Sequence, residues 1–461
     1  MKQGVANSVE SMAQGATLAS IRWLLACLSL VMLLSSLGTS IANVGLPMLA
    51  QAFRATFQQV QWIVLAYLLA VTTLVVVVGR LGDLIGRRRL LLTGIAIFTT
   101  GSALCGAAPT LWLLIAARAV QGVGAAIMMT ISVALVAAAV PKSKTGSAMG
   151  LLATMSAVGT VLGPALGGVL IASLGWHAIF LIKVPIGLVA WLLAYRFLPA
   201  DPARLATTRG GFDHAGTLLL ALTLAAYALA MTTGRGSFGA VNAALLLAAF
   251  TGAAFFVLVE TKAVAPLMQL TLFRDPVLST GFAMSVLVVT VMMATLVIGP
   301  FYLAGTLALD AAGVGLVMSS GPVVAVLAGM PAGRMADRFG SRRMIIAGLT
   351  VMAAGCILLA VLPVSFGVAG YVGALVAVTA GYAFFQAANN TAVMMNVQPD
   401  QRGVVSGLLN LSRNLGLVTG ASVMGAIFAA TGMQRTFGVG AVLIIVALVI
   451  ALAVRAKGGN D

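Results

Sequence analysis

The sequence predicts an all-helical polytopic membrane protein, and three features of its composition lead to this class. Of 461 residues, 61% are hydrophobic and only 8% are charged, whereas a soluble protein carries roughly 25% charged residues. Mean hydropathy is +1.11, and 52 residues are glycine, a residue that is frequent where transmembrane helices pack closely. The uninterrupted apolar runs are about 20 residues long, the length of a membrane-spanning helix and about twice that of a barrel strand.

Fourteen such runs can be counted along the chain. Short loops separate them, so no folded domain outside the membrane is expected. The predicted spans are residues 22–46, 60–80, 90–108, 111–139, 146–172, 177–197, 214–233, 240–260, 277–303, 311–333, 343–362, 368–393, 403–429 and 437–455.

Basic residues give the predicted orientation. With both termini in the cytoplasm, 20 of the 26 Lys and Arg residues lie on the cytoplasmic side, as the positive-inside rule requires. An even number of spans follows, because the loss of one helix would invert half of the loops. The first apolar run is too long for the core of a cleaved signal peptide, so residues 1–21 are expected to form a cytoplasmic tail.

An internal repeat divides the chain into two halves. The segment GRLGDLIGRRR at 79–89 returns as GRMADRFGSRR at 333–343, and PKSKTGSAMGLL at 141–152 is similar to PDQRGVVSGLL at 399–409. Such a repeat indicates two related bundles in parallel orientation. The predicted organisation is an N-terminal tail at 1–21, a six-helix bundle at 22–197, a linker with two extra helices at 198–276, a second six-helix bundle at 277–455 and a short tail at 456–461.

Several function classes find no support in the composition. The net charge of +16 comes from only 36 charged residues, scattered between apolar runs, so nucleic-acid binding is not expected. No lysine follows a glycine, which excludes a phosphate-binding Walker loop. The two histidines, His177 and His214, form no metal-binding spacing with the three cysteines. No catalytic, metal or cofactor site is therefore predicted.

Polar residues recur at helical spacing inside several predicted spans. Because a charge inside a membrane helix is costly, it usually faces a water-filled cavity or a partner, and stripes in several spans favour one shared cavity between the halves. Hydrogen bonds between helices are the alternative. The residues are Ser36, Thr39, Ser40, Asn43, Arg118, Gln121, Lys183, Gln386, Asn389, Asn390, Asn410 and Arg413.

The fifth span carries a stripe of small residues. Gly159, Gly163 and Gly167 are four residues apart and share one helical face, Gly168 follows them, and Pro164 introduces a kink. This face allows another helix to approach at backbone distance. Static packing and a hinge for movement require the same residues, so the sequence leaves both open.

These motifs together resemble the major facilitator superfamily, in its fourteen-span drug:proton antiporter branch. The resemblance covers essentially the whole chain. It rests on Gly79, Asp83, Gly86, Arg87 and Arg88 between spans 2 and 3, on Arg118, Gln121, Gly122 and Gly124 in span 4, on the span-5 stripe with Pro164, and on FDHAG at 212–216 and PLMQLTLFR at 266–274. In the second half Gly333, Asp337, Gly340, Arg342 and Arg343 repeat the loop motif. Ion pairs there are expected to act as a conformational switch between two states of the bundles.

Two positions depart from the family pattern. Many relatives carry an aspartate near the middle of span 1, where this chain has Gly38, and an asparagine is usual where it has Lys183. No acidic residue is embedded in a predicted span. The interior is therefore expected to be cationic, which favours anionic or neutral substrates over lipophilic cations.

The resemblance implies a secondary transporter with alternating access that exports small amphipathic molecules by proton antiport, in the manner of a multidrug efflux protein. The alternative is an exporter or facilitator of one specific anionic or neutral metabolite, because Gly38 replaces the acid. A membrane sensor or enzyme is less favoured. The expected partners are a small-molecule substrate, protons and the lipid bilayer, and we expect a monomer in the cell inner membrane.

Overall fold

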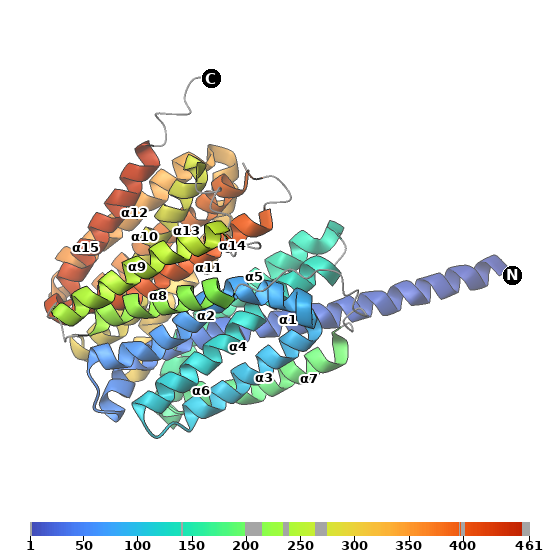
Figure 1. Cartoon of the computed structure of the whole chain (residues 1–461), viewed down its shortest axis with the longest axis horizontal. Helices are drawn as coiled ribbons and strands as arrows, with labels where there is room; N and C mark the ends of the chain where they lie inside the picture. Colours follow the sequence, from blue (N-terminus) through green and yellow to red (C-terminus); the bar gives the residue numbers. More distant parts are fainter. Residues whose placement is uncertain are drawn as a thin grey trace.

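A computed structural model gives the arrangement of the chain (Figure 1). It describes the backbone of residues 2–139, 142–198, 214–233, 239–262, 274–395, 397 and 402–453. Every regular element in these ranges is helical. The predicted all-helical fold class is thus confirmed.

The N-terminal half contains seven helical segments. They are α1 (Lys2–Ala52), α2 (Phe57–Ile85), α3 (Arg87–Gly106), α4 (Leu111–Ala139), α5 (Lys142–Leu174), α6 (Ala178–Leu181) and α7 (Lys183–Phe197). The helix of α1 already begins at Lys2, so the predicted tail is helical and continuous with the first span. The short α6 and α7 together form the sixth crossing.

The inserted pair and the C-terminal half follow. The insertion consists of α8 (His214–Thr232) and α9 (Ala240–Lys262). The C-terminal half consists of α10 (Pro276–Gly305), α11 (Ala311–Phe339), α12 (Ser341–Val361), the 3₁₀ turn η2 (Val364–Phe366), α13 (Gly367–Met395), α14 (Arg402–Thr419), the π-helix η3 (Gly420–Met424) and α15 (Gly425–Ala453).

Twelve helices within the described ranges are long and apolar enough to cross a membrane. One of them, Val405–Ala453, has 49 residues, far more than the roughly 20 that one crossing needs. Gly432 interrupts it with φ 80° and ψ −178°, a backbone conformation that glycine adopts at little cost. Dividing this segment at Gly432 and adding the shorter apolar helix Leu218–Thr232 gives the fourteen predicted crossings.

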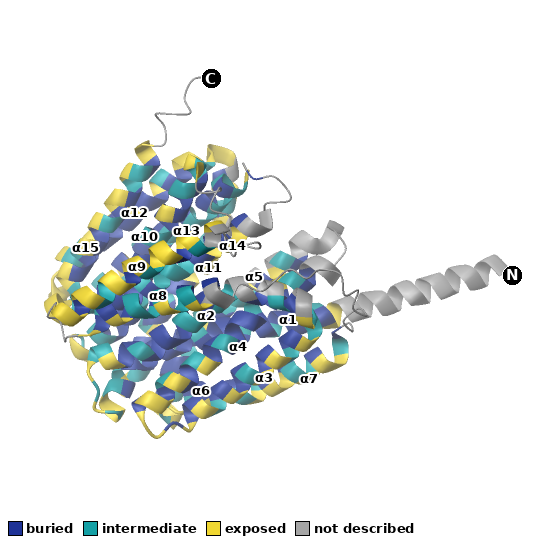
Figure 2. Cartoon of the chain, viewed as in Figure 1, coloured by how far each residue is buried: buried dark blue, intermediate teal, exposed yellow. Residues whose placement is uncertain are grey.

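Each half has its own hydrophobic core (Figures 1 and 2). We call the end with the loops at 53–56, 107–110, 175–177 and 306–310 the outer end, and the end with Gly86 and Gly340 the inner end. Residues of the C-terminal half that join the N-terminal core come from the outer parts of α10, α11 and α14 and from η3. They are Met293, Leu296, Val297, Phe301, Ala311, Leu417, Val418 and Ala421. Within the described ranges, the shared packing of these cores therefore lies toward the outer end.

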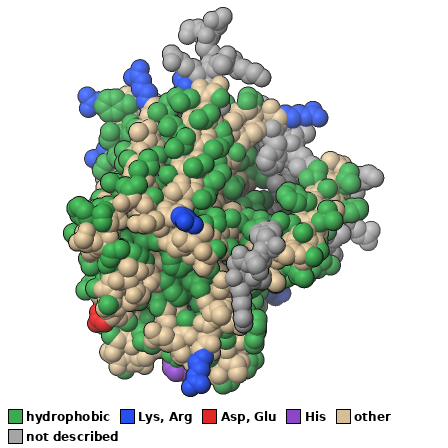
Figure 3. Space-filling model, turned by 90° about the vertical axis from the view of Figure 1, so that its left-hand side faces the viewer, with side chains coloured by type: hydrophobic (Ala, Val, Ile, Leu, Met, Phe, Trp, Pro, Cys, Tyr) green, Lys and Arg blue, Asp and Glu red, His purple; other side chains and the backbone are tan. Residues whose placement is uncertain are grey.

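The inserted helix α8 lies at the junction of the two halves (Figure 1). Leu220 and Leu224 of α8 pack with Phe256 of α9, and the same cluster includes Leu69 of α2 and Leu415 of α14. Viewed from the left of Figure 1, the surface is largely hydrophobic with few, separate charged side chains (Figure 3). Such a surface fits contact with lipid tails.

Candidate functional site

On helix α14, the side chains that are least buried are polar. Ser406 and Asn410 are exposed, and Arg413 and Asn414 are partly exposed, whereas Val405, Leu408, Leu409 and Leu411 on the other side are buried. A polar stripe is costly against hydrocarbon, so it indicates a water-filled space. We call the space that these residues face the pathway.

Helix α13 contributes a second polar face beside α14. The phenol oxygen of Tyr382 accepts a 3.4 Å hydrogen bond from Nη2 of Arg413, and Nε2 of Gln386 donates to Oδ1 of Asn390 at 2.8 Å. All four side chains are partly exposed. Asn389 instead turns away and is buried. Of the three amides predicted in this span, Gln386 and Asn390 therefore share the face of α13 on which Tyr382 contacts Arg413.

The Asn389 amide joins α13 to α10. Its Nδ2 donates to the Gly281 carbonyl at 3.2 Å and to Oγ of Ser285 at 3.0 Å. This is the interhelical bonding that the sequence left open as the alternative to a cavity-lining role.

The serines of α1 face α5. The hydroxyls of Ser36 and Ser156 share a 2.6 Å hydrogen bond, and Ser40 donates to the Gly159 carbonyl at 3.2 Å. Thr39 is partly exposed and donates to the phenol oxygen of Tyr67 at 3.3 Å. The predicted polar stripe of α1 is thus divided: Ser36 and Ser40 are buried against α5, whereas Thr39 lies on a partly exposed side of the helix.

Asn43 has a different environment from the other polar residues of α1. It is 2% exposed, and neither atom of its amide has a hydrogen-bond partner in the part of the chain that the structure describes. The adjacent Val44 belongs to the core of the C-terminal half. Asn43 therefore lies near the meeting of the halves with unused hydrogen-bonding capacity, which is costly to bury.

Arg118 of α4 is fully enclosed in the N-terminal half. Its Nε donates to the Ile63 carbonyl at 2.9 Å and Nη1 to the Gly38 carbonyl at 3.0 Å. Nη1 also donates to Gln121, whose amide donates to Ser102. The guanidinium lies 4.3 Å from the centroid of the Tyr67 ring. Arg118 thus connects α4 to α1 and α2.

Lys183 is the second enclosed basic residue. It is 0% exposed, and Nζ lies 4.9 Å from the ring centroid of Phe180 and 5.9 Å from that of Phe98. No described residue accepts a hydrogen bond from Nζ. The structure therefore separates the three cations predicted to share one cavity: Arg413 faces the pathway, while Arg118 and Lys183 lie inside the N-terminal bundle.

The packing around Gly38 accounts for the missing acid of span 1. A Cβ atom at this position would lie 2.9 Å from Cζ of Phe98 and 3.4 Å from the Tyr67 hydroxyl. Phe98 thus occupies the space that a side chain of residue 38 would need. No carboxylate of residues 22–52 in α1 lies beside the enclosed basic residues Arg118 and Lys183.

The glycine stripe of α5 makes two different contacts. Gly159, Gly163 and Gly167 face α1, where Cβ atoms would meet Leu33, Ser40 and Ile41. Gly168 faces the other half, and its Cβ would lie 2.6 Å from the Ala311 carbonyl oxygen of α11. Its counterpart Gly315 would in turn meet the Pro164 carbonyl. Gly159, Gly163 and Gly167 therefore pack within the N-terminal half, and the adjacent Gly168 makes the contact between the halves.

The repeated loop motif has the same backbone geometry in both halves. Gly86 has φ 105° and ψ 134°, and Gly340 has φ 87° and ψ 140°. Each glycine makes a one-residue turn between two helices with a positive φ that disfavours other residues. The helices on either side of each turn thereby connect directly.

Arginines after these turns donate to backbone carbonyls of their own half. Arg87 donates to Ala134 at 3.1 Å, Arg88 to Tyr195 at 2.6 Å and Arg342 to Leu452 at 3.4 Å. Carbonyls near the C-terminal end of a helix carry partial negative charge, which attracts a guanidinium. Gly333 is partly exposed and Arg343 is exposed. Gly79 and the side chains of Asp83 and Asp337 lie outside the part described in atomic detail.

The outer end is closed by aromatic and amide contacts between the halves. The ring of Phe57 on α2 lies 4.7 Å from Phe301 and 5.1 Å from Phe428, centroid to centroid. One turn further along α2, Nε2 of Gln61 donates to the Ala421 carbonyl in η3. We call Phe57, Gln61, Phe301 and Phe428 the outer gate.

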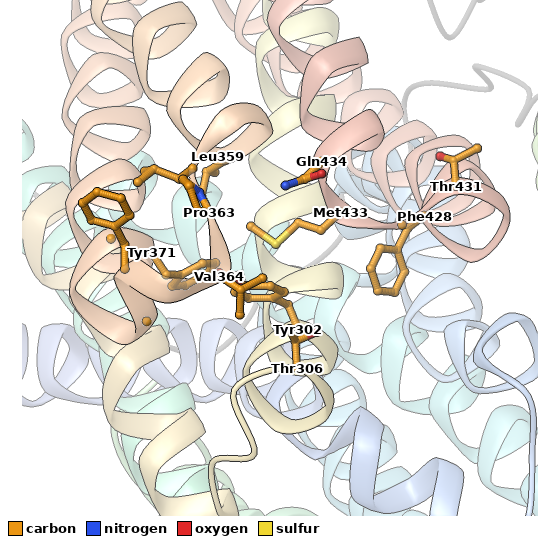
Figure 4. Close-up of a pocket in the computed structure, with 15 residues that line it drawn as sticks. Tyr302, Thr306, Leu359, Pro363, Val364, Tyr371, Phe428, Thr431, Met433 and Gln434 are labelled. Carbon is orange, nitrogen blue, oxygen red and sulfur yellow. The ribbon is translucent and has the colours of Figure 1, made fainter.

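A cavity of about 460 Å³ lies at the outer end of the C-terminal half (Figure 4). Tyr302, Tyr371, Phe428, Met433 and Gln434 contribute to its lining. None of the predicted site residues lines it. The cavity is thus separate from the polar faces of α13 and α14.

Comparison with known proteins identifies the family. The model of the Major Facilitator Superfamily matches residues 28–302 and 282–459. The chain belongs to this superfamily. It is accordingly a multi-pass membrane transporter and not an enzyme.

Relatives within the superfamily are named for different substrates. The riboflavin transporter RibZ of Clostridioides difficile (strain 630) is 32% identical over 399 residues, 86% of each chain. The drug efflux pump JefA of Mycobacterium tuberculosis (strain CDC 1551 / Oshkosh) is 32% identical over 406 residues, 85% of this chain and 77% of the relative. The multidrug efflux pump LfrA of Mycolicibacterium smegmatis (strain ATCC 700084 / mc(2)155) is 30% identical over 410 residues, 88% and 80% of the two chains.

Solved structures show the same fold at low identity. A bacterial homolog of the human lysosomal transporter Spinster, in an inward-facing and occupied conformation, has a TM-score of 0.70 at 15% identity and covers 95% of this chain and 97% of its own. A D-xylose-proton symporter has a TM-score of 0.69 at 14% identity, with 94% and 97% coverage. The major facilitator fold is thereby confirmed.

Sequence reasoning missed part of the helix packing in this superfamily member. Gly416 and Gly420 bring α14 and η3 against α10, where Cβ atoms would meet the Val286 carbonyl and Met293, as the α5 glycines do against α1. The signal was available, because these glycines are four residues apart. Tyr67, Phe98 and the outer gate gave no comparable signal, since single aromatic residues in apolar runs are ordinary.

Proposed function

We propose that this transporter exports small amphipathic molecules by alternating access, driven by proton antiport. The observation that carries the proposal is the asymmetric contact between two related bundles: the halves pack together at the outer end, while α13 and α14 present polar, partly exposed side chains along the pathway. A substrate entering from the inner end would meet Arg413, Tyr382, Gln386, Asn390 and Asn410. Relatives named as drug efflux pumps support this substrate class.

In the export step the outer end would open and the inner end would close. Opening requires the outer gate and the Gly168–Gly315 contact to separate, and the glycine turns of the loop motifs then approach at the inner end. We expect the orientation predicted from the basic residues, with both termini in the cytoplasm, and a monomer as the working unit. The two ends of the pathway are then alternately accessible, as in transporters built from repeats.

A second candidate is export of one specific neutral or anionic metabolite. It is favoured because Arg413 is a charged side chain that faces the pathway while no acidic residue occurs in the described parts of α13 and α14. A relative named as a riboflavin transporter supports a neutral aromatic substrate of this kind.

Everted membrane vesicles with an imposed pH gradient separate these candidates. Ethidium, riboflavin and carboxyfluorescein serve as cationic, neutral and anionic probes, and an uncoupler is added in parallel. Proton-driven export predicts uptake of at least one probe that the uncoupler abolishes. Accumulation that continues unchanged after the gradient has collapsed would disprove proton coupling.

The probe preference then decides between the two substrate classes. Uptake of several probes supports the amphipathic-drug exporter, whereas uptake of riboflavin or carboxyfluorescein alone supports the metabolite exporter. Arg413→Gln tests the assignment of the pathway: it should lower carboxyfluorescein uptake about tenfold, because one charge-assisted hydrogen bond contributes about 1.5–3 kcal/mol. Arg435→Gln, in an exposed position near the outer end, is the matched control.

A further inference from the structure

Lys183 is a buried ionisable group that the polar faces of the pathway do not use. Its amine is enclosed between the rings of Phe180 and Phe98, 4.9 and 5.9 Å from their centroids, with no acceptor among the described residues. An ammonium in such surroundings lacks both water and a counter-charge, so the enclosed site favours the neutral amine.

The groups around Lys183 strengthen this argument. The ionisable groups that act electrostatically on Lys183 are Arg118 of α4 and the Cys105 thiol of α3. On α1, Cys27 contacts the Ala190 carbonyl of α7, and on α2 the Tyr67 phenol lies beside Arg118. The spans 22–52, 87–106, 111–139 and 178–197 contain no Asp or Glu. Asp83 lies near the inner end of α2, so within these four spans a proton on Lys183 would face a fixed positive charge and no negative one.

The position of Lys183 connects it to the part of α1 that the halves share. Phe98, which flanks the amine, packs against Gly38, and Arg118 donates to the Gly38 carbonyl. On the adjacent side of α1, the hydroxyl of Thr39 bonds to Tyr67, whose ring lies over Arg118. Thr39 is partly exposed, so hydroxyl groups connect the surface of α1 to Tyr67 and Arg118.

Closure of the outer end covers this region of α1. Val44 packs into the core of the C-terminal half, and the outer gate lies beyond it. Separation of the halves at the outer end removes this cover and admits outer water to the adjoining face of α1. The solvation of Lys183 then depends on which end of the transporter is open.

We propose that Lys183 is the proton-carrying residue of this transporter. The neutral amine binds one proton while the outer end is open, and the resulting ammonium releases that proton to the inner solution after the outer end closes. This inference rests on the proposed proton antiport and gives it a carrier in a chain whose first span lacks an acid.

A distance measurement without any substrate tests the carrier role. Spin labels on Leu174→Cys and Thr306→Cys report on the outer end, because both positions are exposed and belong to opposite halves. The native cysteines are buried and leave the introduced pair as the labelling sites. In the wild type we expect acidification to increase the population with the longer distance, because protonation selects the outer-open state.

Neutral and charged substitutions of Lys183 should fix this equilibrium in opposite senses. Lys183→Gln and Lys183→Met, which are permanently neutral, should keep the short distance at every pH, and two such variants guard against failure of one to fold. Lys183→Arg, which stays charged, should keep the long distance. Arg435→Gln removes an exposed charge and should respond as the wild type does. A wild-type pH response that persists in a folded neutral variant, or is absent from the wild type, overturns the proposal.

Transport in proteoliposomes separates this result from the proposed function. With ethidium or riboflavin as probe, Lys183→Gln should lose gradient-driven accumulation, because a transporter that stays closed at the outer end cannot complete the cycle. If the wild type moves neither probe, the proposed substrate class fails while the distance measurement still decides the role of Lys183. If the wild type accumulates probe and Lys183→Gln accumulates it equally, only the carrier role fails.

Discussion

Arg118 and Arg413 are both arginines within membrane spans, but they differ in burial and in hydrogen-bond partners. Arg413 is partly exposed and bonds to a phenol beside the pathway. Arg118 is enclosed, and its donors reach backbone carbonyls of α1 and α2. These carbonyls lie inside the helices α1 and α2, where each already accepts a backbone N–H, so Arg118 adds a second bond that ties α4 to both. Arg118 is therefore expected to hold three helices together in addition to any part in transport.

Replacement of Arg118 should thus reduce stability as well as transport. Arg118→Ala removes charge-assisted hydrogen bonds worth about 1.5–3 kcal/mol each, so the purified protein should unfold at a lower temperature and transport should be abolished. Thermal unfolding in detergent is the measurement, and Arg118→Lys, which cannot reach both carbonyls, should be intermediate. An unchanged unfolding temperature with lost transport would assign the residue to transport alone.

At the level of elements, helix α5 uses closely spaced glycines for two contacts, one with α1 and one with α11. Gly163 lies against Ser40 of α1 within the half, and Gly168 lies against α11 of the other half. A helix can approach at backbone distance only where side chains are absent. The same stripe therefore contributes to the stability of one bundle and to the closure between two.

Enlarging these two glycines should separate the two effects. Gly163→Leu overpacks the α1–α5 contact and should destabilise the fold by about 1–3 kcal/mol, seen as a lower unfolding temperature. Gly168→Leu should leave stability nearly unchanged but weaken outer closure, so that Phe301→Cys reacts faster with a membrane-impermeant maleimide. Equal effects of both substitutions in both assays would contradict this division.

The inserted helix α8 connects to both halves at the outer gate. Nε1 of Trp62 on α2 donates to Oγ1 of Thr232 at 3.1 Å, and the Tyr227 hydroxyl bonds to Thr419 of α14 at 3.3 Å. A helix that bonds to both bundles on one side of their junction favours the state in which they are close. We therefore expect the insertion to stabilise outer closure.

Removal of either bond should make the outer end open more often. Trp62→Phe and Tyr227→Phe each lose about 0.5–1.5 kcal/mol, which corresponds to a few-fold faster maleimide labelling of Phe301→Cys. Thr251→Val on α9 removes a bond within its own helix only and serves as the control. Labelling at the control rate in both variants would show that α8 has no influence on the gate.

At the level of the whole molecule, the outer gate decides which end of the pathway is accessible. Phe57 belongs to the first half, and Phe301 and Phe428 belong to the second. Two packed bundles have few intermediate arrangements, because close-packed interfaces separate rather than stretch. Transport is therefore expected to need complete separation of this gate in every cycle.

A reversible link across the gate should stop the cycle. In the double variant Phe57→Cys and Phe301→Cys, a bifunctional methanethiosulfonate should block probe uptake into everted vesicles, and a reducing agent should restore it. Each single variant treated in the same way is the control. Full uptake with the link in place would mean that the gate does not need to open.

Much of the fold could be predicted from the sequence, and the candidate site only in outline. The fourteen crossings follow from the lengths of apolar runs, and within the described ranges the break at Gly432 divides one continuous helical segment into two of them. The repeated loop glycines, Gly86 and Gly340, have matching geometry in the two halves. The sequence predicted one cavity for Arg118, Lys183 and Arg413, whereas the structure encloses Arg118 and Lys183 in the N-terminal half and leaves Arg413 partly exposed.

The sequence by itself determined the membrane class, the duplication and the superfamily, because run length, charge bias and repeated motifs are properties of a linear chain. Only the tertiary structure decided which polar side chains meet water. That choice depends on how each helix is rotated against its neighbours, and Gly38, Phe98 and the glycine contacts of α5 set those rotations by filling or leaving space. Two arginines with similar surroundings in the sequence thereby came to lie in a bundle interior and beside the pathway.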